Sequence, residues 1–129
     1  IWEPVKENKI KLIYVSDGDY RSLMEDLVRI GVDGFHVEWD PRFSRRDVEN
    51  LMERHGGNKI FLLHPSYEVL SRGSIPEVEE EARWFISLSR KYPSVFFAGT
   101  PPGNPVNEEV FLRTWFSERY CGNMFRELI

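Results

Sequence analysis

The chain has 129 residues, of which 41% are hydrophobic and 14% aromatic, and its formal net charge at pH 7 is −4. This length and apolar content suffice for one domain with a buried core and argue against an intrinsically disordered protein. The acidic net charge argues against a nucleic-acid-binding protein. The absence of an apolar run of about 20 residues argues against a membrane protein. The single cysteine, Cys121, excludes an internal disulfide and is typical of a cytoplasmic protein.

The first eight residues form a polar lead-in that contains Pro4, and no signal-peptide pattern is present. Because the first residue is Ile1 rather than Met, we expect the chain to be a fragment, a processed product or a trimmed form of a longer protein.

Four apolar segments are predicted to be β-strands, and each is followed by a loop and a helix-like stretch. The strands cover residues 10–15, 32–39, 59–64 and 94–98. The first of them, IKLIYV, has the composition of a strand buried on both faces. Because helices connect consecutive parallel strands, this alternation predicts a parallel sheet in a single α/β domain that spans residues 1–129.

The helices between the strands have recognisable ends. Gly31 is placed to end the first helix, Ser44 to cap the second, and Ser74 to cap a long helix that ends near Tyr92. The helices are predicted over residues 20–30, 45–55, 74–92 and 107–119, with a short helical turn over 66–70. Their expected core residues are Leu23, Leu27, Val28, Ile30, Val48, Leu51, Met52, Val78, Ala82, Phe85, Ile86 and Leu88.

Carboxylates follow the first predicted strand directly, in the run Asp17-Gly18-Asp19. In parallel sheets, functional groups gather at the carboxyl ends of the strands. Asp17 and Asp19 there are candidates to bind an amine or pyrrole N–H, or to act as a base. The alternative is structural, because Asp also caps helices and Gly adopts positive φ in turns.

The second and third strands end in further polar groups. His36, Glu38 and Asp40 alternate along the second strand and share one face, whereas Trp39 lies on the other with Phe35 and Val37. With His64 they contain nitrogen and oxygen donors that suit a divalent metal. The alternative, which we favour, is that these polar groups hydrogen-bond one another or lie in a water-filled barrel interior. We expect no metal and no cofactor. His64 begins the run His64-Pro65-Ser66-Tyr67, in which a histidine is suited to transfer protons and Tyr67 to contact a ligand.

Two further groups of residues have mainly structural interpretations. The acidic run over residues 77–81 is expected to be a solvated helix face. The aromatic residues are expected to lie mostly in the core: Trp84, Phe85, Phe96, Phe97, Trp115 and Phe116.

A series of short motifs occurs in the same order as in a known protein family. The series comprises Asp17-Gly18-Asp19, Gly31-Val32-Asp33-Gly34, Glu38-Trp39, a strand after Gly57, Gly73 and Pro76-Glu77-Val78-Glu79-Glu80-Glu81. It resembles the C-terminal half of the uroporphyrinogen decarboxylase superfamily, which consists of (β/α)8 barrels and includes decarboxylases of the porphyrin pathway and methyltransferase relatives.

The resemblance implies that the chain is half of a (β/α)8 TIM-type barrel. The complete protein would bind a small organic acid, tetrapyrrole or methyl donor at the strand ends, with possible lyase or methyltransferase-related activity. Asp17 and His64 are then the candidate catalytic residues. The candidate substrate-binding residues are Asp19, Glu38, Trp39 and Tyr67.

The sequence also departs from the family pattern. The loop over residues 99–105 lacks the histidine that is typical of the true decarboxylases, and Ser16-Asp17-Gly18 stands where zinc-dependent relatives have a histidine and a cysteine. These departures favour an alternative, a non-catalytic half-barrel that acts as a binding or assembly module. A weaker alternative is a flavodoxin-like open sheet with helices on both faces.

Four parallel strands cannot close a barrel, so half a barrel leaves two strand edges and one apolar sheet face in water. Ile13, Val15, Phe61 and Leu63 are expected to line that face. We therefore expect the chain to associate with a missing N-terminal half or with a second copy of itself.

Overall fold

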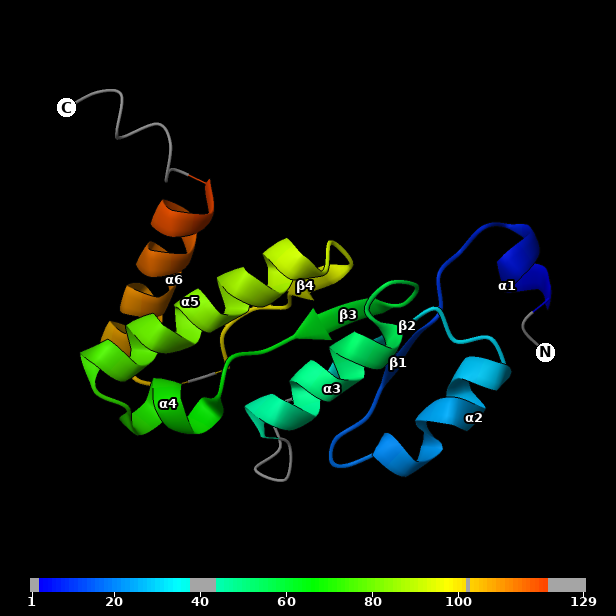
Figure 1. Cartoon of the computed structure of the whole chain (residues 1–129), viewed down its shortest axis with the longest axis horizontal. Coiled ribbons are helices and arrows are strands. Elements are labelled where there is room, and N and C mark those ends of the chain that lie inside the picture. The colour runs from blue at the N-terminus through cyan, green and yellow to red at the C-terminus, as the bar shows by residue number, and fades with distance from the viewer. Residues whose placement is uncertain (1–2, 38–43, 102, 121–129) are drawn as a thin grey trace. The chain divides into compact units, whose positions relative to one another are not determined.

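The computed structural model describes residues 3–37, 44–101 and 103–120. The chain forms two compact units, and each is described by itself (Figure 1). The sheet unit comprises the residues up to Leu63 and residues 92–98, and the helical unit comprises residues 64–91 and those from Gly99 onward.

The sheet unit contains a four-stranded parallel sheet. Its strands are β1 (Ile13–Val15), β2 (Gly34–Val37), β3 (Ile60–Leu63) and β4 (Val95–Phe97), and their order in the sheet is β1-β2-β3-β4. All three pairs are parallel, which confirms the predicted α/β class and sheet type. Each described strand lies beside its neighbour in sequence, an order without the switch point of a doubly wound sheet.

The register divides the sheet into a buried and an open face. On the buried face, Phe35 is aligned with Phe61, and Phe61 with Val95; all three side chains are buried. On the open face, Val15 is aligned with His36, and Leu62 with Phe96. Val15 is 60% exposed and Phe96 51% exposed.

This division corrects two expectations. Phe61 and Leu63 lie on the buried face, opposite to Ile13 and Val15, because the register aligns the odd-numbered residues of β1 with the even-numbered residues of β2 and β3. The strand β1 is not buried on both faces, since Val15 is largely exposed. Phe96 likewise is not a core residue.

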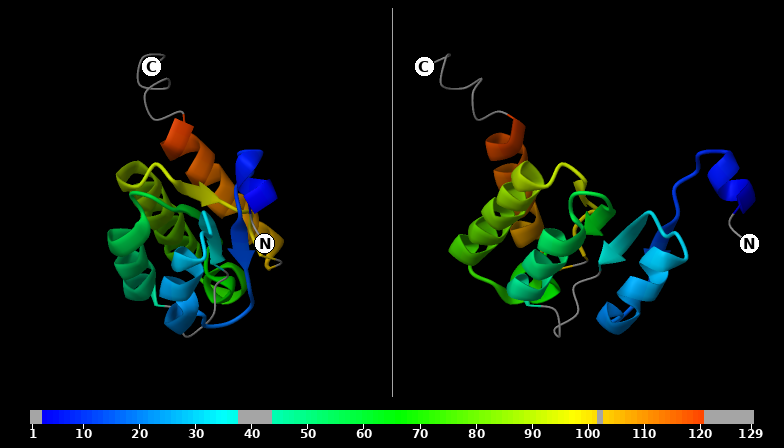
Figure 2. Two further views of the ribbon diagram at one scale, coloured as in Figure 1. Left: turned by 90° about the vertical axis from the view of Figure 1, so that its right-hand side faces the viewer. Right: turned by 45° about the vertical axis from the view of Figure 1, so that its right-hand side comes forward.

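The helical elements of the sheet unit are α1 (Glu3–Glu7), the 3-10 turn η1 (Arg21–Leu23), α2 (Met24–Arg29) and α3 (Arg45–His55). The helices α2 and α3 lie on the same side of the sheet, in contrast to the flavodoxin-like alternative (Figures 1 and 2). The predicted bounds of α3 are confirmed, and its predicted core residues Val48, Leu51 and Met52 are buried. The predicted polar lead-in contains the short helix α1.

The segment after β1 packs differently from the expectation. Tyr20 and Met24 are buried there, whereas Leu23 and Ile30 are largely exposed. The reason is the 3-10 turn η1, which changes the helical phase that a continuous α-helix over 20–30 would have. The Tyr20 ring stacks on Phe35 at a centroid distance of 6.1 Å, and its hydroxyl donates to the His36 carbonyl oxygen at 3.0 Å.

The helical unit contains α4 (Tyr67–Arg72), α5 (Ile75–Lys91) and α6 (Pro105–Tyr120). The ring of Phe85 on α5 contacts the rings of Phe111 and Trp115 on α6, with centroid distances of 6.0 and 6.3 Å. The predicted core residues of α5 are all buried, whereas Phe116 on α6 is largely exposed. Among the described residues, no helix is both long enough and apolar enough to cross a membrane.

Candidate functional site

The turn after β1 carries the first pair of predicted site residues. Gly18 has a φ of 89°, in the left-handed region that favours glycine, so the turn depends on this residue. Asp17 before it is exposed. Asp19 after it accepts a hydrogen bond from the Arg21 backbone N–H at 3.0 Å, which starts the turn η1. Asp17 is therefore exposed to solvent, whereas the Asp19 carboxylate makes a hydrogen bond within the turn.

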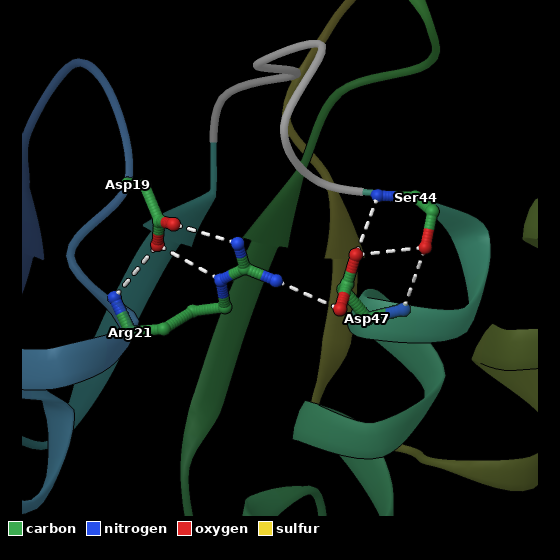
Figure 3. A network of polar contacts seen from close by, with 4 residues as sticks. All are labelled: Asp19, Arg21, Ser44 and Asp47. Carbon is green, nitrogen blue, oxygen red and sulfur yellow. Dashed lines mark hydrogen bonds and ion pairs between the residues drawn. The ribbon is translucent and has the colours of Figure 1, made fainter.

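The Asp19 carboxylate also binds the Arg21 side chain, which reaches a second carboxylate on α3 (Figure 3). Arg21 Nε and Nη2 donate to Asp19 at 2.9 and 2.6 Å, and Nη1 lies 2.7 Å from Asp47 Oδ1. We call Asp19, Arg21 and Asp47 the arginine clamp. It joins the turn after β1 to the first turn of α3.

The α3 end of the arginine clamp is also a capping box. Asp47 Oδ2 accepts from the Ser44 N–H at 2.9 Å and from its hydroxyl at 2.7 Å, while the Ser44 hydroxyl oxygen accepts from the Asp47 N–H at 3.2 Å. These bonds with Ser44, followed by the charge of Arg21, lower the pKa of Asp47. The bond with Asp19 raises the pKa of Arg21 further. Both residues of the Arg21–Asp47 pair are therefore charged at neutral pH.

The loop between β2 and α3 contains the second set of predicted residues. Glu38 and Trp39, together with Asp40, lie outside the described residues. Their neighbour His36 lies on the open face of the sheet and is half-buried. The predicted placement of His36 on the face opposite to Phe35 and Val37 is confirmed.

The segment after β3 carries His64 and Tyr67, in the helical unit. His64 is half-buried, and its Nδ1 lies 2.8 Å from the Gly99 carbonyl oxygen. Pro65 and Ser66 are buried, whereas Tyr67 is largely exposed at the start of α4. The Ser66 hydroxyl oxygen accepts from the Val69 N–H at 3.3 Å and so caps α4. His64 and Tyr67 therefore lie on a short segment with an anchored backbone.

Glu81 on α5 anchors this segment and was missed by the sequence interpretation. Its side chain is 1% exposed, and its Oε1 accepts from the Ser66 N–H at 2.8 Å. The expected solvated acidic face is thus wrong at Glu81. The available signal was helical phase, because Glu81 is three residues after Val78 and four before Phe85, on the buried stripe of α5.

A cavity of about 470 Å³ lies in the sheet unit, near the amino ends of β1 and β2. Its lining includes Lys11 and Asp33, whose charged groups are 3.5 Å apart. The Asp33 carboxylate accepts from the Leu12 N–H at 2.9 Å, and this bond is the main cause that lowers the pKa of Asp33. The cavity lies beside the amino ends of these strands, whereas Asp17 and Asp19 follow the carboxyl end of β1.

The structure thus places Asp17 and Asp19 in the sheet unit and His64 and Tyr67 in the helical unit. In the part of the chain that it describes, no three side chains of His, Cys, Asp or Glu gather as metal ligands. Comparisons of the chain with protein-family models, curated proteins and solved structures find no match.

Proposed function

We propose that this chain is half of a decarboxylase-like (β/α)8 barrel, and that the complete protein binds a small molecule at the carboxyl ends of the strands. One observation carries the proposal: the described strands are parallel and in sequential order, with one face buried and the other open. A closed barrel has this strand order, and it covers both faces of its sheet.

The open face explains why the half needs a partner. Val15 and Phe96 are more than half exposed there, beside half-buried Ile13, Ile60 and Leu62. Each 100 Å² of apolar surface removed from water contributes about 2.5 kcal/mol. Covering several such side chains therefore contributes an amount comparable to the roughly 5–15 kcal/mol net stability of a domain. In this proposal the missing strands come from an N-terminal half or from a second copy of the chain.

Asp17 and His64 are the proposed proton-transfer residues. Asp17 is exposed in the turn after β1, and His64 follows β3 directly. Both thus lie next to the carboxyl end of a parallel strand, where barrel enzymes hold their substrates. Asp19, Glu38, Trp39 and Tyr67 are the proposed substrate contacts, no cofactor is required, and the single cysteine favours the cytoplasm as the location.

The partner requirement is tested by placing a charge on the open face. We expect the wild-type chain to associate at micromolar concentration in sedimentation velocity, and Val15→Glu to weaken this association at least tenfold. Val106→Glu is the matched control, because Val106 on α6 is 59% exposed and Val15 60%. A well-folded wild-type monomer, or equal effects of the two substitutions, would contradict the half-barrel.

The chemistry is tested with the complete protein by following CO2 release from small organic acids and porphyrinogens. General acid–base catalysis contributes roughly 10²–10⁴-fold in rate. We therefore expect Asp17→Asn and His64→Gln each to lower kcat about 100-fold. Asp26→Asn, which alters an exposed carboxylate on α2, serves as the control. Unchanged activity in the Asp17 and His64 variants removes them from the mechanism.

The second candidate function is a non-catalytic binding or assembly module. The observation that favours it is the arginine clamp, in which Asp19 makes structural bonds to Arg21. For this candidate we expect association through the open face but no turnover of any carboxylated substrate. Turnover that depends on Asp17 or His64 would exclude it.

A further inference from the structure

The cavity of about 470 Å³ near the amino ends of β1 and β2 is lined mainly by positive charge. Its lining residues are Lys6, Lys9, Ile10, Lys11 and Asp33. Three of the five lysines in the chain thus line one cavity, although the chain as a whole has a formal net charge of −4. Three ammonium groups and one carboxylate give the lining a net charge of +2. Like charges around one cavity repel one another, and a negatively charged ligand relieves this repulsion.

The backbone at Lys9 is a second, independent observation. Lys9 has a φ of 59° and is the one residue other than glycine with a positive φ in the described part of the chain. Its N–H donates to the Lys6 carbonyl oxygen at 2.9 Å, and the Ile10 N–H donates to the Val5 carbonyl oxygen at 3.1 Å. These are the two bonds of a Schellman motif at the end of α1, in which glycine usually occupies the position of Lys9. A lysine that adopts this strained conformation indicates a function for its side chain.

The other two lysines are positioned by neighbouring groups. Lys11 Nζ lies 3.5 Å from Asp33 Oδ1, and the Leu12 N–H holds the same carboxylate through Oδ2 at 2.9 Å. Lys6 passes so close to Gly31 that a Cβ on Gly31 would collide with Lys6 Nζ. The absence of a side chain at Gly31 therefore leaves room for the Lys6 ammonium group beside the cavity.

We propose that this cavity binds a small organic phosphate monoester, with its phosphate group against the three lysines. Lysine binds phosphate as a point charge, and a phosphate monoester carries about 1.5–2 negative charges at pH 7, which balances the lining. Small-molecule sites have volumes of roughly 300–1,000 Å³, so the cavity leaves room for an organic group next to Ile10. The Asp33 carboxylate has further lone pairs, which accept a hydrogen bond from a hydroxyl of that group.

This site is separate from the turn that carries the first proposed catalytic residue. The cavity lies near the amino end of β1, whereas Asp17 follows its carboxyl end. The inference therefore goes beyond the half-barrel. Its failure would leave the half-barrel intact, because sedimentation tests that proposal through the open face.

Binding is measured by 1H–15N NMR of the full chain at neutral pH and constant ionic strength, from the shifts of the Lys9, Ile10 and Lys11 amides. We expect glycerol 3-phosphate to shift these amides and to saturate the site at millimolar concentration. Inorganic phosphate should act at higher concentration, because it lacks the organic group. Glycerol, the uncharged counterpart, should have no effect. Succinate should bind more weakly than glycerol 3-phosphate, because its two charges lie on separate carboxylates.

Two variants test the lysines one at a time. Lys9→Gly removes an ammonium group and introduces the residue that the Schellman motif favours, so the fold is retained. We expect Lys9→Gly and Lys11→Gln each to weaken the binding of glycerol 3-phosphate about fivefold, the upper end of what one exposed charge pair contributes. Lys91→Gln is the matched control, because it removes the same charge from the exposed end of α5 in the helical unit. The inference is overturned if glycerol 3-phosphate leaves the three amides unshifted, if glycerol or succinate acts equally, or if Lys91→Gln weakens binding as much.

Discussion

Adjacent leucines on β3 offer a direct test of the two-faced sheet. Leu63 lies on the buried face and is 2% exposed, whereas Leu62 lies on the open face and is half-buried. Leu62→Ala and Leu63→Ala remove the same atoms from the same strand. The difference between their effects on the free energy of unfolding therefore reports the environment of each face.

The expected magnitudes follow from burial. Leu63→Ala removes a buried side chain and leaves a cavity, which costs roughly 2–5 kcal/mol. Leu62→Ala loses less than about 1.5 kcal/mol in the isolated chain, because part of its surface already meets water. The proposed association with a second copy would cover the open face, so the free-energy cost of Leu62→Ala should rise with protein concentration.

The assay is urea unfolding monitored by circular dichroism at low and high micromolar concentrations. The midpoint should fall while the m-value stays constant, so that the change reflects stability alone. Equal costs for Leu62→Ala and Leu63→Ala at the lowest concentration would refute the assignment of faces. A cost of Leu62→Ala that is independent of concentration would refute coverage of the open face by a second copy.

Four further predictions concern single side chains. Arg21→Gln should lower the melting temperature. High salt should reduce the difference in melting temperature from wild type, because the residues of the arginine clamp are partly exposed and salt screens their charges. A decrease in melting temperature that does not depend on salt would contradict an electrostatic clamp. Glu81→Ala should lower the free energy of unfolding in urea by about 2 kcal/mol, and Glu81→Gln by less, because only Ala leaves the buried Ser66 N–H without its acceptor. Equal losses in the two variants would argue against a stabilising hydrogen bond between Glu81 and Ser66. Burial is the largest cause that lowers the pKa of His55 in the folded state. The contribution of neutral His55 to the free energy of unfolding is therefore present above the unfolded pKa near 6.5 and is lost as pH falls through the folded pKa. His55→Gln should flatten the dependence of stability on pH between about pH 7 and 5, as measured by urea unfolding at each pH. Tyr20→Phe should lower the free energy of unfolding by about 1 kcal/mol, because it removes the hydrogen bond to the His36 carbonyl oxygen. Because burial raises the pKa of Tyr20, the wild-type protein should lose stability above about pH 10, and the Tyr20→Phe variant should lose less. Thermal melts at a series of pH values check both effects.

Local patterns in the sequence were sufficient for the four strands and for the helices α3, α5 and α6, but not for α1 or the turn η1. The bounds of α3 follow from Ser44 at its start and from the spacing of Val48, Leu51 and Met52, all within one helix. The parallel sheet follows from the alternation of strands and helices, because chain connectivity restricts how such strands can pair. Both kinds of information are contained in short segments or in the order of segments.

The faces of the strands required the tertiary structure. β3 reads IFLL and β4 reads VFF, so apolar residues point to both sides and no alternation marks the buried face. The phase of the segment after β1 also depended on the 3-10 turn η1, which apolar spacing does not reveal. Burial in these segments is decided by which elements cover the sheet.

The sequence by itself determined the four strands, the long helices and the carboxylates and histidine next to the strand ends. The tertiary structure alone decided the partners of those side chains: Arg21 reaches Asp47, His64 meets Gly99, and buried Glu81 binds the Ser66 N–H. The reason is physical. Helix caps and periodicity act over a few residues, whereas these contacts join positions that become neighbours only after the chain has folded.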